Sequence, residues 1–180
     1  VGWSLGGQLA LQAALVAPQR VAGLGLIATT PCFVQRADWA RAMPVETFEA
    51  FVEQLDADPQ AVLQRFLTLQ VKGDGAARSA LKRLRDALAA RPKPRIDGLR
   101  GGLALLRDTD LRGRLASLGC AQQWLFGERD ALVPAGLAAW LARQVPVAGV
   151  ATIAQAGHAP FLSFSQQSLR SLRQSIDGHH

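Results

Sequence analysis

The feature that most restricts how this chain can fold is a glycine and serine pattern at residues 2–6, which read GWSLG. It matches G-x-S-x-G, a pattern typical of a sharp turn between a strand and a helix. We expect both glycines to be needed where the backbone passes close to itself, because a Cβ would clash there. Residues 5–17 then carry apolar side chains at helical spacing and end before Pro18. The pattern therefore predicts a strand, a tight turn that exposes Ser4, and a helix.

Strands and helices alternate at both ends of the chain. Residues 21–29 form a short apolar run bounded by turn residues, which is typical of a buried parallel strand. Similar runs lie at 122–126 and 147–154, and predicted helices follow them at 134–143 and 161–176. Because strands that alternate with helices build a parallel sheet, we expect an α/β fold, a mostly parallel sheet flanked by helices.

The middle of the chain has a different character, with several helical segments and no convincing strand. The predicted helices lie at 44–55, 76–90 and 101–106, and another begins at Pro59 with Asp58 as its N-cap. We therefore expect a helical lid (31–109) inserted between two parts of one core (1–30 and 110–180). It would cover the sheet edge at which ligands bind in open α/β folds.

Composition narrows the class of protein. Hydrophobic residues make up 49% of the chain and charged residues 19%, as in a globular domain. No apolar run is long enough to span a bilayer, so we expect no membrane association. Cys32 and Cys120 are predicted to be free thiols, which favours a reducing compartment and a cytoplasmic location. Potential metal ligands do not cluster, and we expect neither a metal nor a cofactor.

Basic residues are concentrated in one part of the chain. The formal net charge is +6, and between residues 61 and 115 Lys and Arg outnumber Asp and Glu by more than two to one. Arg78, Lys82 and Arg85 share one side of a predicted helix. Such a patch attracts an acidic partner. Aromatic interleaving and nucleic-acid motifs are missing, so an acidic protein is at least as good an interpretation of the patch as nucleic acid, and we expect no nucleic acid as the partner.

Two further residues favour a role for Ser4 as the nucleophile of a hydrolase. A serine is a weak nucleophile unless a base takes its proton, and His158, after a predicted strand, is the sensible base. Asp130, also at a strand end, is the predicted carboxylate that orients the imidazole, with Glu128 as the weaker candidate. The backbone N–H of Leu5 would be one oxyanion donor.

Each of these residues has an ordinary structural explanation when it is taken alone. The serine pattern also occurs in glycine-rich turns without catalysis, the histidine could cap a helix, and the aspartate could cap a turn. The order Ser4, Asp130, His158 is nevertheless the order found in α/β-hydrolases, and the three together favour a catalytic triad. The other histidines, His179 and His180, are interpreted as a tail.

These motifs resemble the α/β-hydrolase superfamily along the whole chain. Within it, the sequence resembles the pimeloyl-acyl-carrier-protein methyl ester esterases of bacterial biotin synthesis. The matching stretches are residues 2–7 (GWSLGG), 30–33 (TPCF), 65–70 (RFLTLQ), 101–103 (GGL) with 109–112 (TDLR), and 156–161 (AGHAPF). The lid segment 65–70 is the most specific to that family.

The resemblance implies cleavage of a methyl ester on a carrier-bound pimeloyl chain, with release of methanol. In this scheme Ser4 attacks the carbonyl, His158 takes its proton and later activates water, and Asp130 orients the imidazole. The residues that would line the acyl pocket are Phe66, Leu67, Thr68, Leu69 and Gln70.

The resemblance also implies that basic lid residues dock the acidic acyl carrier protein. By position these are Arg65, Arg78 and Lys82. Lys82 departs from the family's usual arginine, which keeps the charge but loses the bidentate geometry. Ala61 stands where the family has a further docking arginine, so the docking interpretation is weaker there.

Two alternatives remain open at this stage. One is a generalist carboxylesterase that acts on small molecules, and the other is a non-catalytic ligand-binding member of the same fold. Because Val1 falls inside the serine motif, we also expect preceding residues to be missing, including N-terminal strands and the second oxyanion donor. These 180 residues alone are therefore expected to be inactive.

Overall fold

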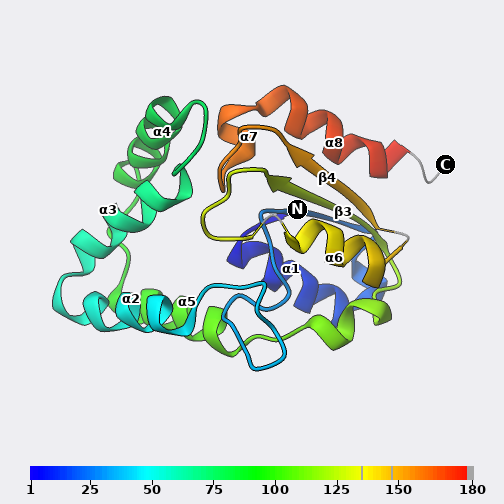
Figure 1. Cartoon of the computed structure of the whole chain (residues 1–180), viewed down its shortest axis with the longest axis horizontal. Coiled ribbons are helices and arrows are strands. Elements are labelled where there is room, and N and C mark those ends of the chain that lie inside the picture. The colour runs from blue at the N-terminus through cyan, green and yellow to red at the C-terminus, as the bar shows by residue number, and fades with distance from the viewer. Residues whose placement is uncertain (135, 147, 178–180) are drawn as a thin grey trace.

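The computed structural model describes residues 1–134, 136–146 and 148–177 (Figure 1). Its centre is a parallel sheet of four strands in the order β1-β2-β3-β4. The strands are β1 (Gly2–Trp3), β2 (Gly23–Ile27), β3 (Ala121–Gly127) and β4 (Gly149–Ile153). The predicted parallel α/β fold is confirmed.

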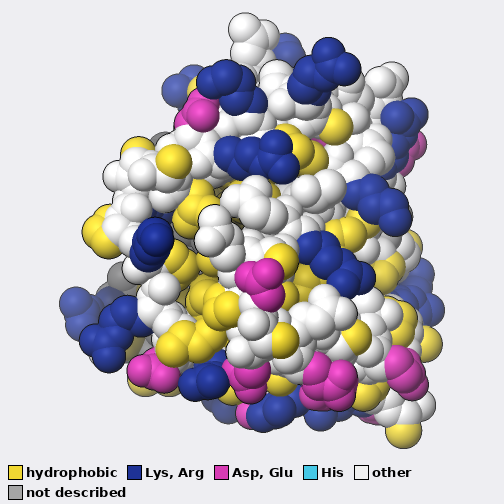
Figure 2. Space-filling model, turned by 90° about the vertical axis from the view of Figure 1, so that its left-hand side faces the viewer, with side chains coloured by type: hydrophobic (Ala, Val, Ile, Leu, Met, Phe, Trp, Pro, Cys, Tyr) yellow, Lys and Arg dark blue, Asp and Glu magenta, His cyan; other side chains and the backbone are white. Residues whose placement is uncertain are grey.

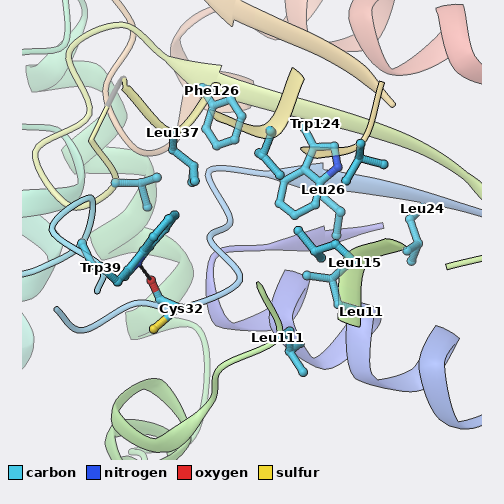
Figure 3. Packing of buried hydrophobic residues seen from close by; sticks show 14 of the residues in the cluster. Leu11, Leu24, Leu26, Cys32, Trp39, Leu111, Leu115, Trp124, Phe126 and Leu137 are labelled. Carbon is cyan, nitrogen blue, oxygen red and sulfur yellow. Dashed lines mark hydrogen bonds between the residues drawn. The ribbon is translucent and has the colours of Figure 1, made fainter. Parts of the chain in front are cut away.

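Helices cover both faces of this sheet (Figure 1). The core helices are α1 (Leu5–Val16), α6 (Gly136–Gln144), α7 (Pro160–Ser163) and α8 (Ser165–Asp177), with 3-10 turns at Pro18–Arg20 and Arg112–Ser117. Successive side chains of β3 point to opposite faces of the sheet. Trp124 and Phe126 pack with Leu11 of α1 and Leu137 of α6 (Figure 3), whereas Leu125 faces the α7–α8 side. The strand is thus buried on both faces, which explains its continuous apolar run.

We keep the name lid for the segment 31–109, which contains α2 (Val45–Ala57), α3 (Pro59–Gln70), α4 (Ala77–Ala89) and α5 (Ile96–Asp108). Asp58 caps α3 as expected, because its Oδ1 accepts from the backbone N–H of Ala61 at 3.0 Å. In the described part of 31–109 we find helices and isolated bridges but no strand.

Two helices differ from the sequence expectation by more than a residue or two at an end. Helix α5 spans Ile96–Asp108 rather than only 101–106, because the packing of Leu99, Leu103 and Leu106 outweighs the poor helix propensity of its glycines. The predicted final helix is broken at Phe164 into α7 and α8, and both aromatic side chains at the break pack against the sheet.

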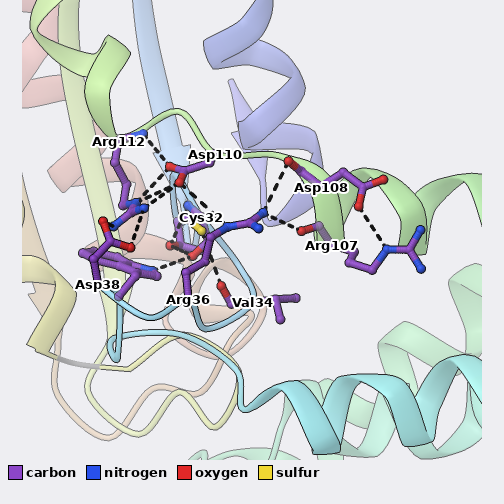
Figure 4. A network of polar contacts seen from close by, with 10 residues as sticks. Cys32, Val34, Arg36, Asp38, Arg107, Asp108, Asp110 and Arg112 are labelled. Atoms are coloured by element: carbon purple, nitrogen blue, oxygen red, sulfur yellow. Dashed lines mark hydrogen bonds and ion pairs between the residues drawn. The ribbon is translucent and has the colours of Figure 1, made fainter.

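A polar network joins the two ends of the lid (Figure 4). Cys32 forms an isolated bridge with Asp110, and Arg112 pairs with Asp38 at 3.0 Å and with Asp110 at 2.6 Å. The hydrogen bond from Arg112 lowers the pKa of each carboxylate, while Asp110 in turn raises the pKa of Arg112. The entry and exit of the lid are therefore fastened to each other beside the core.

Candidate active site

Ser4 occupies the turn between β1 and α1 in a backbone conformation that most residues avoid. Its φ is 52° and its ψ is −120°. The backbone N–H of Ser4 donates to the carbonyl of Ile27 at 2.9 Å, which ties the turn to the end of β2. Such a conformation costs on the order of 1–3 kcal/mol and persists only where the surroundings impose it. Leu5 opens helix α1, so its N–H lies in the first turn, where no intrahelical acceptor exists.

Tight packing around this turn accounts for two glycines. A Cβ on Gly2 would collide with the backbone of Gly6 and Gly7, and a Cβ on Gly7 would collide with Thr29. A Cβ on Gly6, by contrast, would meet nothing within 4 Å. The expectation that both glycines of the motif avoid a clash is therefore correct for Gly2 but wrong for Gly6. The second close approach falls one residue later, at Gly7.

His158 is held by Asp130. The distance from His158 Nδ1 to Asp130 Oδ2 is 2.8 Å, and both side chains are fully buried. The other carboxylate oxygen, Oδ1, accepts from the backbone N–H groups of Leu132 at 2.8 Å and Val133 at 3.0 Å. Because a carboxylate only accepts, the imidazole proton belongs on Nδ1 and the lone pair on Nε2. This is the tautomer that a general base requires.

Glu128, the weaker candidate for the orienting carboxylate, has a different partner. Its Oε2 accepts from the backbone N–H of Gln155 at 2.9 Å. It therefore braces the loop before His158 instead of holding the imidazole.

Trp3 links the turn at Ser4 to the loop that carries His158. We call this loop, residues 154–159, the histidine loop. The indole Nε1 donates to the carbonyl of His158 at 2.8 Å, and the two ring centroids lie 5.8 Å apart. Nε2 of His158 is buried and has no hydrogen-bond partner among the described residues. The bond between serine and histidine is thus not made in this structure, as is common before a substrate is bound. Nε2 remains free to accept the proton of the Ser4 hydroxyl.

A cavity of about 360 Å³ opens beside Ser4, between the core and the lid. The described residues that line it are Trp3, Ser4, Leu5, Phe51, Leu55, Val62, Leu63, Phe66, Gln70, Gly98, Leu99, Gly102, Leu103 and Leu106. Apart from the indole of Trp3, the polar side chains of this wall are Ser4 and Gln70. Such a wall suits an aliphatic chain whose reacting end lies at the serine.

Of the five residues expected to line an acyl pocket, two line this cavity. Phe66 and Gln70 lie one helical turn apart on the cavity side of α3. Leu67, Thr68 and Leu69 are not part of the wall, because successive helical residues point in different directions. Thr68 is exposed and its hydroxyl donates to the carbonyl of Gln64 at 2.9 Å.

Half of the residues that line the cavity come from helices α2 and α5, which the sequence analysis did not connect with the site. Phe51 and Leu55 belong to α2, whereas Leu99, Leu103 and Leu106 belong to α5. Their spacing of three or four residues does indicate one apolar helix face. It could not show that the face meets a cavity instead of solid core, because that depends on how the helices pack.

The expected docking residues are all exposed on the lid. Arg65 donates to Gln54 Oε1 at 2.8 Å, and its guanidinium lies 5.0 Å from the ring centroid of Phe51, a residue of the cavity wall. Arg78 has no carboxylate partner among the described residues. Lys82 is already paired with Asp86 at 2.7 Å.

The described residues show nothing that points to a metal or a membrane span. They contain no group of three or more His, Cys, Asp or Glu side chains suited to a metal ion. None of the described helices combines the length and the hydropathy needed to cross a bilayer. Both cysteines are free.

Comparisons with known proteins agree with this geometry. A family model described as "Alpha/beta hydrolase family" matches residues 1–168. Curated relatives named "Pimeloyl-[acyl-carrier protein] methyl ester esterase" come from Nitrosomonas europaea and Xanthomonas campestris pv. campestris (strain B100). The first is 43% identical over 92% of this chain and 66% of its own length. The second is 44% identical over 98% of this chain and 69% of its own length. The chain thus spans about two thirds of the length of these relatives.

Solved structures show the same fold at lower identity. An esterase from Exiguobacterium antarcticum superposes with a TM-score of 0.84 at 22% identity, over 98% of this chain and 65% of its own. A bromoperoxidase from Bacillus anthracis gives a TM-score of 0.83 at 19% identity, over 98% of this chain and 66% of its own. At such identities the likeness concerns the fold alone.

Proposed function

Because this chain belongs to the alpha/beta hydrolase family, we propose that it is a serine carboxylesterase that cleaves the methyl ester of pimeloyl-acyl carrier protein in biotin biosynthesis. The observation that carries the proposal is the place of Ser4. It lies in the wall of a nearly apolar cavity, and its neighbour Trp3 contacts His158, whose Nδ1 lies 2.8 Å from Asp130 and whose Nε2 has no hydrogen-bond partner among the described residues. The names and identities of the curated relatives support the choice of substrate.

The reaction follows from these groups. Oγ of Ser4 attacks the ester carbonyl carbon while His158 Nε2 takes the hydroxyl proton, and the carbonyl oxygen becomes an oxyanion near the N–H of Leu5. The C–O bond to the methoxy group then breaks, and His158 returns the proton so that methanol leaves. Water next attacks the acyl-enzyme, again giving a proton to His158. Ser4 recovers its proton as the free carboxylic acid departs.

The charges of the lid support an acidic carrier as the bearer of the acyl chain. Figure 2 views the lid side of the molecule, where Lys and Arg side chains gather over the upper part and hydrophobic side chains show in the middle. Arg65 and Arg78 would contribute most to docking, because the charge of Lys82 is partly met by Asp86. Free thiols and this carrier-bound substrate are consistent with a cytoplasmic enzyme.

Methanol release provides the test. The gene product that contains residues 1–180 is incubated with methyl pimeloyl-acyl carrier protein, alongside its Ser4→Ala variant. We expect turnover by the wild type and a loss of at least about 1,000-fold in the variant. Equal rates for the two proteins would reject the proposal. Turnover of small esters with none of the carrier-bound ester would instead support a generalist esterase, which the apolar cavity also fits.

A further inference from the structure

The turn between α3 and α4, residues 70–75, lies against both loops that carry the proposed catalytic groups. We call it the lid turn. His158 donates its backbone N–H to the carbonyl of Gln70 at 2.9 Å. Arg129, next to Asp130, donates from Nη1 to the carbonyl of Gly73 at 3.4 Å. The lid turn therefore contacts both the histidine loop and the loop after β3, which carries Asp130.

Asp74 makes the closest of these links. Its Oδ2 accepts the backbone N–H of Gly157 at 2.8 Å, and its Oδ1 accepts the N–H of Ala76 at 2.7 Å. Asp74 is only 8% exposed. Hydrogen bonds from N–H groups to a buried carboxylate are stronger than those between neutral groups. The carboxylate thus joins the start of α4 to the residue immediately before His158.

Gly157 packs closely against the lid turn. A Cβ on Gly157 would lie 3.2 Å from Cβ of Asp74 and 3.1 Å from the carbonyl oxygen of Gln70. On the far side of Asp74, Gly75 donates its N–H to the carbonyl of Gln155 at 2.9 Å. The backbone of Gln155, Gly157 and His158 is consequently hydrogen-bonded to the lid turn.

These bonds bear on the imidazole because no described residue forms a hydrogen bond with its Nε2. Asp130 restrains the ring at Nδ1, and Nε2 has no partner among the described residues. The direction in which Nε2 points then depends on the backbone at His158. That backbone is held by Trp3 at its carbonyl, by Gln70 at its N–H and by Asp74 one residue earlier.

We propose that Asp74 is a positioning residue for His158, which lets the lid set the direction of the catalytic base. The inference rests on the proposed hydrolase function. Asp74 does not line the cavity, and its carboxylate is bonded to Gly157 and Ala76, so we expect it to act through the loop it binds. The ordinary alternative is that Asp74 merely stabilises the start of α4 through its bond to Ala76.

Asp58 offers a matched control for that alternative. It also accepts a backbone N–H at the start of a lid helix, from Ala61 at 3.0 Å, but it is exposed and, within the described part of the chain, forms no hydrogen bond with the histidine loop. We therefore compare Asp74→Ala, Asp74→Asn and Asp58→Ala in the gene product that contains residues 1–180. Hydrolysis of p-nitrophenyl butyrate is measured per active site, after titration of the active serine.

For Asp74→Ala we expect kcat to fall by about 10-fold to 100-fold with little change in KM, because small misplacements of a catalytic group cost this much. Asp74→Asn should recover part of the loss, since its amide oxygen can still accept the N–H of Gly157. Asp58→Ala should lower the melting temperature but leave kcat per active site unchanged. Equal kcat for Asp74→Ala and the wild type, or equal losses for Asp74→Ala and Asp58→Ala, would overturn the proposal.

A second readout separates this inference from the proposed function. We expect the proton between His158 Nδ1 and Asp130 Oδ2 to give a far-downfield NMR resonance, which would report on that hydrogen bond in the folded protein without any substrate. We expect the resonance to move in Asp74→Ala and to stay in place in Asp58→Ala. If the wild type hydrolysed no ester, the proposed function would fail while this shift still tested the positioning. An unmoved resonance in Asp74→Ala would reject positioning alone.

Discussion

Asp130 and His158 meet through a 2.8 Å contact between Oδ2 and Nδ1, with both side chains fully buried. The geometry leaves Asp130 no freedom, because its second oxygen is occupied by the N–H groups of Leu132 and Val133. The carboxylate can therefore hold the imidazole in only one tautomer, the one with the lone pair on Nε2.

Replacing this carboxylate should cost far more activity than stability. In Asp130→Asn the amide can present its NH₂ group to Nδ1, which favours the wrong tautomer, and we expect kcat to fall by about 10³-fold to 10⁴-fold. Steady-state kinetics on a p-nitrophenyl ester measures this. Glu128→Gln is the matched control, because Glu128 accepts from Gln155 and not from the histidine. A loss in Glu128→Gln as large as in Asp130→Asn would contradict the assignment.

The cavity predicts a dependence on acyl length. Gly102 faces it from α5, and a Cβ there would lie 3.6 Å from Cδ2 of Leu5. In Gly102→Leu the added side chain should fill space next to Ser4. We expect kcat/KM for p-nitrophenyl octanoate to fall by at least about 10-fold relative to that for the acetate, because steric exclusion grows with chain length.

The neighbouring glycine provides the control for this experiment. Gly101 is exposed, is not part of the cavity wall, and a Cβ there would meet nothing within 4 Å. Gly101→Leu should therefore leave the ratio of the two substrates unchanged. An unchanged ratio in Gly102→Leu would show that the acyl chain does not occupy this cavity.

The lid arginines predict a loss specific to the carrier-bound ester. Changing Arg65, Arg78 and Lys82 together to Gln should lower kcat/KM for methyl pimeloyl-acyl carrier protein by about 10-fold or more at low salt, because charge attraction speeds association. Hydrolysis of a small ester should hardly change. Among single variants, Lys82→Gln should have the smallest effect, since Asp86 already balances its charge.

Three basic residues of the core serve as the control for charge alone. Arg20, Arg114 and Arg143 are exposed and lie outside the lid helices. Their combined change to Gln removes the same net charge and should have a much smaller effect on the carrier-bound ester. Equal losses in both triple variants would mean that overall charge, not a docking site on the lid, drives association.

The network at the ends of the lid predicts a pH-dependent contribution to stability. Arg112 lowers the pKa of Asp110 below its ordinary value in the folded state, mainly by a hydrogen bond. A carboxylate with a lowered pKa stabilises the fold above its unfolded pKa, and this contribution is lost as the pH falls through the folded pKa. Asp110→Asn should therefore lower the free energy of unfolding by about 1 kcal/mol at pH 7. The gap to the wild type should narrow as the pH falls below the ordinary aspartate pKa of about 3.9 toward the lower pKa of Asp110 in the folded state. Urea unfolding at both pH values checks this, and a gap independent of pH would contradict it.

The sequence predicts those features whose determining residues lie close together in the chain. The turn at Ser4 and the cap at Asp58 are encoded within a few residues, and both form where the local pattern indicates. The strand character of β2 and β3 follows from short apolar runs. These features need no knowledge of distant packing.

Features that depend on contacts far apart in the chain could not be read in this way. Position 7 needs a glycine because a Cβ there would collide with Thr29, which is far away in the sequence. Likewise, the N–H of Gly157 bonds to Asp74, which lies in the lid. Nor does helical periodicity reveal that α2 and α5 enclose a cavity. Asp74 in particular looks like an ordinary turn residue in the sequence, because its partner lies 83 positions away.

The most direct test of the account is to find which residue forms the covalent intermediate. The gene product that contains residues 1–180 is treated with a fluorophosphonate, which reacts with an activated serine hydroxyl, and the labelled peptide is mapped by mass spectrometry. We predict one adduct, on Ser4, that disappears in Ser4→Ala and forms at least about 100-fold more slowly in His158→Ala. An adduct on another residue, or one that forms equally fast without His158, would contradict the central claim that Ser4 is activated by the His158–Asp130 pair.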